Sequence, residues 1–411
     1  MKKYVIITRR VTSMGGAQLY ILRRFKHLKS RGYEVCIVVS KHENYFPLEK
    51  EFEGATFLCV PEIDNRLVFQ TKKKQSLIVE NIVNFIGDFE DLIIESHTLS
   101  SIEWGELIAL KCGAKHLAYP LSEATVSQYK FLPGKEIFRD KLNRGEFYGC
   151  SSTSLSFIFD KRNVPNNYVN IGYDETELAA ECIPQISYRK KTGDFVVTTI
   201  TRLDKTYIEF LADAIAQLSV KYRSRNFVLL IVGGCSDIKR EMYLKSSFNN
   251  EKYGLSNLDI RYLGYIDKLG KDIFRLTDVF VGMGTAAINA ISQRCISINI
   301  DPMNGMQFSS GFFGVDTKNF AYSETGKVYP IIVKLESALL LKEDEKEKLK
   351  ITGRRLFDEE FEINQCFRKL DQVVESLPVV CHRNSMEVTF FYRLFIRGLI
   401  CFRKLINSRK L

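Results

Sequence analysis

Runs of apolar residues alternate with amphipathic stretches along most of the chain. The segments 4–8 and 35–39 are almost wholly apolar, which is typical of strands in a parallel sheet that is buried on both faces. Between them, about residues 17–30 follow a helical pattern, and Arg31-Gly32 marks its end because glycine is favoured just after a helix. Further strands are expected in this half near residues 56–60, 91–94, 116–119, 147–150 and 168–171.

The alternation of apolar runs and amphipathic stretches weakens in the middle of the chain and begins again in the second half. From about residue 174 to residue 193, charged residues and a proline replace the apolar periodicity, and we interpret this stretch as a linker. Repeated strand–helix units follow, and they predict an α/β protein with two Rossmann-like, doubly wound parallel sheets. The expected strands are 195–200, 227–232, 259–263, 278–281 and 295–300, and the expected helices are about 208–222 and 286–292.

The length of the chain supports two domains. A chain of 411 residues exceeds what one hydrophobic core usually holds. We place the first domain at residues 1–175, the linker at 176–192, the second domain at 193–378 and a C-terminal tail at 379–411.

The tail holds most of the excess positive charge. Residues 383–411 contain seven basic residues and one acidic residue, so they carry six of the ten net positive charges of the chain. On a helix that begins at Met386, basic side chains lie opposite an apolar face that is rich in phenylalanine. This arrangement is typical of a helix that lies in the plane of an anionic membrane. The alternative is a helix that packs on its own first domain. The apolar face consists of Phe391, Leu394, Phe395, Leu399, Phe402, Leu405 and Ile406.

Composition excludes several classes of protein. The ten cysteines form no C-x-x-C pair, so free thiols are expected rather than disulfides or metal ligands. His27, His42, His116 and His382 are not at metal-like spacing, and no metal is expected. No apolar run of 18 residues could span a membrane, and the stretch before Arg9 is too short for a signal peptide. We therefore expect a cytoplasmic protein, and without an RNA-binding motif beside the basic charge we expect no nucleic-acid partner.

Two strand-to-helix turns carry the same chemistry. Gly15-Gly16 follows the first strand, and Gly284-Thr285 follows the strand at 278–281. The start of a helix presents free backbone N–H groups and the positive end of the helix dipole, which suits a phosphate, and glycine lets a backbone approach a ligand closely. The two turns predict a phosphate-bearing ligand held between the domains. The alternative is that they are ordinary tight turns.

Charged side chains are expected near the same strand ends. Arg202 and Lys205 follow the first strand of the second half and could neutralise a diphosphate. His97 and Glu123 follow strands of the first half, at the ends where α/β clefts form. Either could position or deprotonate an acceptor hydroxyl. For Arg202 and Lys205 the alternative is an ordinary solvated pair at a strand end. For His97 and Glu123 it is a hydrogen-bonded loop histidine and a solvated glutamate.

Taken together and in their order along the sequence, the motifs of this chain resemble those of the GT-B glycosyltransferases, particularly the family-4-like enzymes of bacterial surface-polysaccharide pathways. The resemblance covers about residues 1–375. It implies two Rossmann-like domains that face a cleft, retention of the anomeric configuration, and no metal or other cofactor. It also implies that Gly15, Gly16, Arg202, Lys205, Gly284 and Thr285 bind the donor. The similar motifs are Gly15-Gly16-Ala17-Gln18 with residues 28–35, Asn170–Asp174, Thr201–Lys205, Gly264-Tyr265 and Gly282–Ala290.

One position departs from the family pattern. Asn289 stands where the family has a glutamate that binds the donor ribose, and Val281 stands where it has the paired glutamate eight residues earlier. An amide can still hydrogen-bond a ribose, although it lacks the charge that strengthens the bond. Asn289 is therefore included among the expected donor-binding residues.

The leading hypothesis is a glycosyltransferase. It would move a sugar from a nucleotide-sugar donor to a glycan, with a lipid-linked acceptor, in the synthesis of a cell-surface polysaccharide such as a capsule. The basic tail would hold it peripherally on the inner face of the cell membrane. The alternatives are a catalytically inactive GT-B scaffold, which Asn289 favours, and another nucleotide-sugar enzyme such as an epimerase. The absence of a clear G-x-G-x-x-G motif argues against a dehydrogenase.

Overall fold

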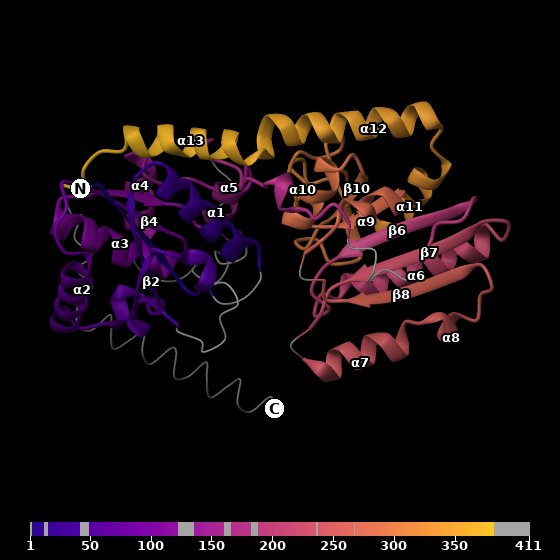
Figure 1. Ribbon diagram of the computed structural model, residues 1–411, viewed down its shortest axis with the longest axis horizontal. Helices are drawn as coiled ribbons and strands as arrows, with labels where there is room; N and C mark the ends of the chain where they lie inside the picture. The colour runs from indigo at the N-terminus through magenta and orange to yellow at the C-terminus, as the bar shows by residue number, and fades with distance from the viewer. Residues whose placement is uncertain are drawn as a thin grey trace. The chain divides into compact units, whose positions relative to one another are not determined.

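The computed structural model contains two β-sheets, each with its own helices (Figure 1). The chain divides into a first unit, made of Met1–Asn170 with Phe367–Leu411, and a second unit, Ile171–Cys366. The structure describes residues 2–11, 15–41, 49–121, 135–159, 166–181, 188–235, 237–266 and 268–381.

The first unit contains a parallel sheet in the order β3-β2-β1-β4-β5. The chain therefore runs outward from β1 in one direction, returns, and continues from β4 in the other. The strands are β1 (Lys2–Thr8), β2 (Glu34–Val39), β3 (Thr56–Cys59), β4 (Asp91–Ser96) and β5 (Lys115–Ala118). The helices are α1 (Gly16–Ser30), α2 (Lys72–Ile86), α3 (Leu99–Cys112), α4 (Lys135–Asn143) and α5 (Ser154–Ile158).

The second unit repeats this order and then extends it. Its sheet has the order β12-β11-β10-β9-β6-β7-β8, in which the five strands β6 to β10 are parallel and the last two are antiparallel. The strands are β6 (Asp194–Ile200), β7 (Asn226–Val232), β8 (Leu258–Gly264), β9 (Val279–Gly282), β10 (Ile296–Ile300), β11 (Phe308–Phe312) and β12 (Tyr329–Pro330). The helices are α6 (Tyr207–Lys221), α7 (Ile238–Ser247), α8 (Asn250–Tyr253), α9 (Lys271–Leu276), α10 (Thr285–Ser292), α11 (Ile331–Leu340) and α12 (Glu343–Leu356).

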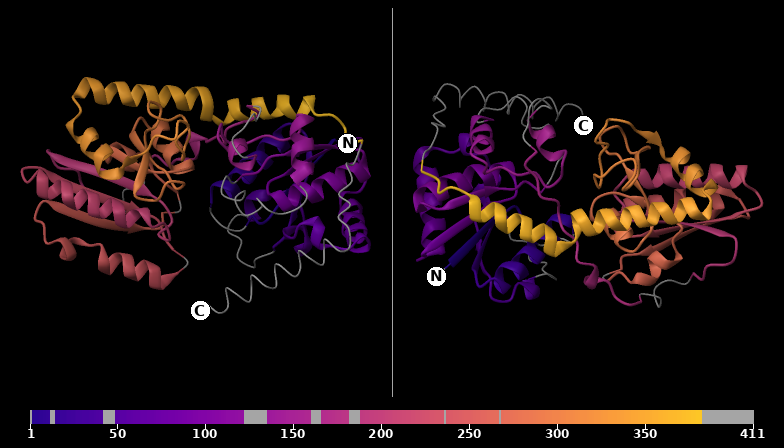
Figure 2. Two further views of the ribbon diagram at one scale, coloured as in Figure 1. Left: turned by 180° about the vertical axis from the view of Figure 1, so that it is seen from behind. Right: turned by 90° about the horizontal axis from the view of Figure 1, so that it is seen from above.

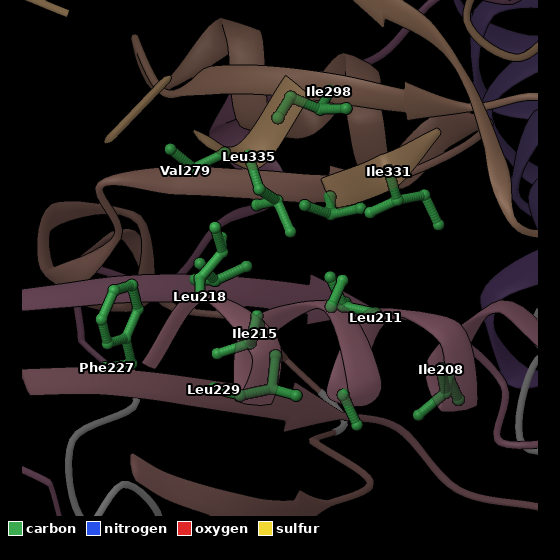
Figure 3. Close-up of a cluster of buried hydrophobic side chains, with 14 of the residues drawn as sticks. Ile208, Leu211, Ile215, Leu218, Phe227, Leu229, Val279, Ile298, Ile331 and Leu335 are labelled. Atoms are coloured by element: carbon green, nitrogen blue, oxygen red, sulfur yellow. The ribbon is translucent and has the colours of Figure 1, made fainter. Parts of the chain in front are cut away.

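Both faces of the second sheet are buried, which explains its nearly continuous apolar strands. In β7, Phe227 and Leu229 belong to the apolar cluster on one face, whereas Val228 and Leu230 belong to the cluster on the other. Helix α6 covers the first of these faces, with apolar residues spaced three or four apart (Figure 3). Burial of one such aliphatic side chain contributes about 1.5–3 kcal/mol. The labelled residues of this cluster are Ile208, Leu211, Ile215, Leu218, Phe227, Leu229, Val279, Ile298, Ile331 and Leu335.

The two doubly wound sheets confirm the fold class expected from the sequence. Two of the expected strands do not form. Segments 147–150 and 168–171 make only isolated β-bridges, Ala118 with Phe147 and Gly149 with Tyr168. The antiparallel strands β11 and β12 were not expected. The amphipathic tail helix lies outside the described residues.

The domain boundaries of the structure differ from those that the sequence suggested. The described part of the expected linker packs within the second unit, where Leu178 and Tyr188 are buried in its apolar core. Its irregular backbone explains why no periodicity marks it. At the other end, α12 continues through a π-helical turn (Phe357–Phe361) into α13 (Ile363–Ser376), as Figure 2 shows. The first unit begins again at Phe367, within α13, rather than after residue 378.

None of the described helices is both long and apolar enough to span a membrane.

Candidate functional site

The predicted residues of the second unit meet at one edge of its sheet. Strands β6 and β9 are neighbours, and the chain leaves them toward opposite sides. In open α/β sheets, a crevice for ligands forms at the carboxyl ends of such a strand pair. Arg202 and Lys205 follow the end of β6 at Ile200, and Gly284 and Thr285 follow the end of β9 at Gly282. The topology therefore brings the two predicted motifs together.

The start of α10 has the properties of an anion site. Gly284 is its N-cap, with φ 68° and ψ −147°, no side chain caps the helix, and no acidic residue occurs in its first turn. The positive φ explains the glycine, because L side chains rarely adopt that conformation. The Gly284 N–H donates to the Phe320 carbonyl at 2.8 Å, and the Ala287 N–H donates to the Gly284 carbonyl at 3.1 Å. The N–H groups of Thr285 and Ala286, at the first two helical positions, have no carbonyl of the helix to bind. These amides and the helix dipole favour a negatively charged ligand.

The loop after β6 is held by backbone contacts with its neighbours. The Thr201 N–H donates to the Val232 carbonyl at 2.9 Å, and the Leu203 N–H donates to the Gly234 carbonyl at 3.1 Å. Gly233 permits this approach, because a Cβ atom there would lie 1.7 Å from the Thr201 carbonyl oxygen. The basic loop therefore has a defined position beside the sheet.

The two cations of this loop are accessible. Arg202 pairs with Asp204 at 3.1 Å, but its side chain is 61% exposed, so the pair is a weak surface contact. Lys205 is half-buried, and no ion pair within the described ranges engages its ammonium group. Both charges can turn toward an anion without breaking a buried interaction.

Asn289 is buried on α10 with an unused polar atom. The residue is 3% exposed, and its Oδ1 has no hydrogen-bond partner among the described residues. A buried carbonyl oxygen without a donor is unfavourable, and a ligand hydroxyl would remove that cost. Val281, by contrast, packs in the apolar core, so no polar group replaces the second glutamate there.

The first unit holds a second polar centre, around Glu95 on β4. This carboxylate is completely buried and has four donors. Tyr4 and Tyr20 donate their hydroxyls at 2.5 and 2.8 Å, Arg24 donates Nε at 3.3 Å, and His97 Nε2 lies 2.7 Å from Oε1. Burial raises the pKa of Glu95, but the His97 hydrogen bond and the Arg24 charge outweigh it and lower the pKa to about 2. The carboxylate is therefore ionised at neutral pH.

This contact fixes the orientation of His97. Because Glu95 is ionised, Nε2 of His97 carries a proton and donates it to the carboxylate, and in the neutral form of the ring Nδ1 keeps its lone pair. Nδ1 is buried and has no hydrogen-bond partner in the described part of the chain. His97 directly follows β4, next to the carboxyl end of β1, as predicted. Its partner Glu95 was missed, although a glutamate directly after the apolar run 92–94, in the same strand, was the signal.

The remaining predicted residues are less informative. Gly15 is the N-cap of α1 and adopts an extended conformation that any residue can take. Gly16 begins that helix, at the carboxyl end of β1. Glu123 lies outside the described residues.

Comparisons with known proteins extend this description. No family model matches the chain, and no curated protein matches its sequence. Solved structures match over nearly the whole chain. Anabaena HepE in complex with UDP has a TM-score of 0.65 and 13% identity, and the alignment covers 92% of this chain and 100% of that one. The chain has the GT-B fold.

Two further glycosyltransferase structures agree. A glycosyltransferase from Rickettsia africae has a TM-score of 0.61 and 14% identity, with 91% of this chain and 98% of that chain covered. Sucrose-phosphate synthase from Thermosynechococcus elongatus has a TM-score of 0.61 and 15% identity, with the same coverage. At these identities the likeness concerns the fold.

Proposed function

We propose that this protein is a glycosyltransferase that uses a nucleotide-sugar donor. The observation that carries the proposal is the meeting of a basic loop and an uncapped helix start at the carboxyl ends of β6 and β9. The solved structures support this proposal, since HepE, which has the same fold, was crystallised in complex with UDP and with UDP-glucose.

The donor diphosphate becomes the leaving group when the sugar is transferred. Arg202, Lys205 and the first amides of α10 neutralise the charge that develops on it. This is why we propose that no metal or other cofactor is needed. Asn289 Oδ1 accepts a hydrogen bond from a ribose hydroxyl of the donor.

The first unit holds the acceptor. Nδ1 of His97 accepts a hydrogen bond from the acceptor hydroxyl, and Glu95 keeps the ring in the required tautomer. The His97 side chain is 1% exposed, so an acceptor must displace the groups that cover it. Glu123 and the glycine pair at Gly15 and Gly16 remain predicted members of the site.

The cellular role belongs to the same proposal. The resemblance described above supports a retaining hexosyltransferase of cell-surface polysaccharide synthesis, such as capsule formation. The basic, aromatic tail supports a lipid-linked acceptor and a peripheral position on the cytoplasmic face of the membrane.

A second candidate is an inactive GT-B scaffold. Asn289 and the buried Val281 favour it, because both positions lack the carboxylates of the family. An inactive protein of this kind would retain the fold without the tight binding of a donor.

Calorimetry with UDP and UDP-glucose tests the site. Arg202→Ala and Lys205→Ala should each weaken binding by about 1.5–3 kcal/mol, the range for hydrogen bonds to charged groups. Asn289→Ala should weaken UDP-glucose binding, whereas Asn289→Glu should retain it. Arg223→Ala and Lys191→Ala are matched controls, since both residues are exposed and lie at the amino-terminal edge of the sheet.

The outcomes separate the two candidates. Unchanged affinity in both Arg202→Ala and Lys205→Ala would place the diphosphate elsewhere. If neither UDP nor UDP-glucose binds the unmodified protein, other nucleotide diphosphates and nucleotide sugars should be screened by thermal shift. A failure of all of them favours the scaffold.

A further inference from the structure

A series of buried and partly buried hydrogen bonds, here called the hydrogen-bond chain, connects α13 with His97. Asp371 on α13 accepts from Arg24 Nη1 at 2.8 Å. Arg24, on α1, then donates Nε to Glu95 Oε2 at 3.3 Å, and the other Glu95 oxygen lies 2.7 Å from His97 Nε2. The hydrogen-bond chain thus runs from Asp371 through Arg24 and Glu95 to His97. Asp371, in the part of α13 that belongs to the first unit, is separated from Arg24 by 347 positions in the sequence.

Burial or further contacts restrain every residue of this hydrogen-bond chain. Arg24 and Glu95 are both completely buried, and Arg24 Nη2 donates to the Tyr4 hydroxyl at 3.0 Å. The guanidinium group also lies 5.5 Å from the ring centroid of Phe367 on α13. Asp371 is the most exposed member, since its side chain is 19% exposed. Arg24 therefore bridges two carboxylates and cannot move toward one without leaving the other.

A purely structural ion pair would not need this arrangement. Two carboxylates on one arginine satisfy its charge, but they do not explain why the far end of the chain holds an imidazole whose second nitrogen is buried without a partner. Within the described residues, the His97 side chain contacts Glu95, and its ring lies 5.6 Å from the Tyr20 ring between centroids, while the Tyr119 ring lies 5.5 Å from that of Tyr20. Glu95 is the one ionised group among them, so its orientation determines the tautomer of His97.

We propose that Asp371 and Arg24 are positioning residues that hold His97, through Glu95, in the Nε2–H tautomer with Nδ1 directed to the acceptor. This inference rests on the proposed function for the role of His97, although the hydrogen-bond chain itself does not. When Asp371 loses its charge, Arg24 moves toward Glu95, the carboxylate turns, and its contact with His97 weakens. The docking of α13 on the first unit is thereby coupled to the state of the candidate catalytic histidine.

Nitrogen-15 NMR of the histidine-labelled full chain tests the proposal directly. The chain has five histidines, and His97→Gln identifies the signals of His97. Unmodified protein should show a protonated Nε2 and an unprotonated Nδ1. Asp371→Asn should shift both signals toward each other, because the second tautomer becomes populated, and Asp371→Glu should restore them. Arg24→Lys, which keeps the charge but cannot bridge both carboxylates, should act like Asp371→Asn.

Two matched controls separate positioning from stability. Glu375 is also a carboxylate on α13 and pairs with Arg31 at 3.8 Å, whereas His27 contacts the second oxygen of Asp371 at 2.8 Å. Glu375→Gln and His27→Gln should leave the His97 signals unchanged. In a donor-to-acceptor transfer assay, Asp371→Asn should be at least about tenfold slower with the same affinity for UDP.

Identical His97 signals in the unmodified protein, Asp371→Asn and Arg24→Lys would overturn the proposal, as would an equal change in Glu375→Gln. Because the signals are measured without donor or acceptor, they decide the positioning chain even if the protein transfers no sugar. Failure of the proposed function would instead appear as a lack of nucleotide binding by a protein whose His97 signals respond as expected.

Discussion

Glu95 shows how one residue can combine a large desolvation cost with a stable ionised state. A lone carboxylate inside a protein shifts its pKa upward because burial disfavours the charge. Here four donors converge on the carboxylate, and the resulting pKa of about 2 means that they outweigh burial. The stability that Glu95 contributes is therefore tied to its charge and depends on pH.

The sign of that dependence follows from the depressed pKa. The folded value of about 2 lies below the ordinary value of about 4.3 for glutamate, so the contribution is complete above about pH 4.3 and is lost as the pH falls toward 2. Glu95→Gln should lower the free energy of unfolding of the first unit by about 3 kcal/mol at pH 7. The difference from the unmodified protein should disappear near pH 2.

Trp104 makes this measurement specific. It is the single tryptophan of the chain and lies completely buried in the first unit, so its fluorescence during urea unfolding reports on that unit alone. Glu51→Gln, which removes a carboxylate that is 49% exposed, should change the stability by less than about 0.5 kcal/mol. An effect of Glu95→Gln that stays constant from pH 7 to pH 2 would contradict the assignment.

The site residues that the sequence predicted are those with local signals. Gly284 and Thr285 follow a strand and precede a helix, so their position at the start of that helix can be inferred from neighbouring residues alone. Arg24 and Asp371 could not be paired in this way, because their contact joins positions 347 residues apart. Glu95 had a local signal, a charge within an apolar strand, but its meaning depends on Tyr4 and Arg24 from other elements.

At the scale of elements, regular strands and helices were predicted well and irregular ones were not. Strands β6 and β7 are buried on both faces and therefore consist of nearly continuous apolar runs. These runs were sufficient to predict both strands. The bridges at Phe147 and Gly149 contain too few residues to show a period. Strand β11 contains two serines and a glycine in its five residues, so its residue types do not favour a strand, and its pairing with β10 decides its structure.

The start of α10 permits a test in which stability and binding should change differently. In Thr285→Asp, a carboxylate enters the first turn of a helix that has no acidic residue there. It should stabilise the fold by about 0.3–1 kcal/mol through the helix dipole. The same charge should repel a diphosphate and weaken UDP binding by at least tenfold. Thermal unfolding and calorimetry measure the two effects.

Lys73→Asp is the matched control for this change. Lys73 is exposed in the first turn of α2, which also lacks an acidic residue, so this change of two charge units should stabilise the protein at least as much as Thr285→Asp does. UDP binding should not change, because α2 belongs to the first unit. If Thr285→Asp binds UDP as well as the unmodified protein does, α10 does not hold the diphosphate.

At the scale of the whole molecule, the same strand order occurs twice. The order β3-β2-β1-β4-β5 of the first sheet corresponds to β8-β7-β6-β9-β10 of the second. This repetition could be predicted because each strand–helix unit carries its own pattern. The return of the chain to the first unit at Phe367 has no such local pattern, because α13 looks like an ordinary amphipathic helix, and a cross-domain helix near residues 355–375 could be expected only from the resemblance to the GT-B family.

The C-terminal tail provides the last prediction, which concerns where the whole molecule works. Residues 383–411 combine an aromatic stripe with six net positive charges, and we expect them to bind an anionic membrane. Removal of the tail should abolish sedimentation with vesicles that contain phosphatidylserine and should leave UDP binding intact. The shortened chain should end at Cys381, because Val380 is buried in the core of the first unit and its N–H donates to the Ala114 carbonyl at 3.0 Å.

Salt and lipid charge provide the controls for this comparison. Binding of the full chain should weaken at high salt and with uncharged vesicles, since surface electrostatics are screened. Equal sedimentation of the two chains would show that the tail is not the anchor. If the shortened chain is insoluble or its Trp104 fluorescence shows an unfolded first unit, the tail instead packs on the protein itself, and its aromatic stripe serves the fold rather than the membrane.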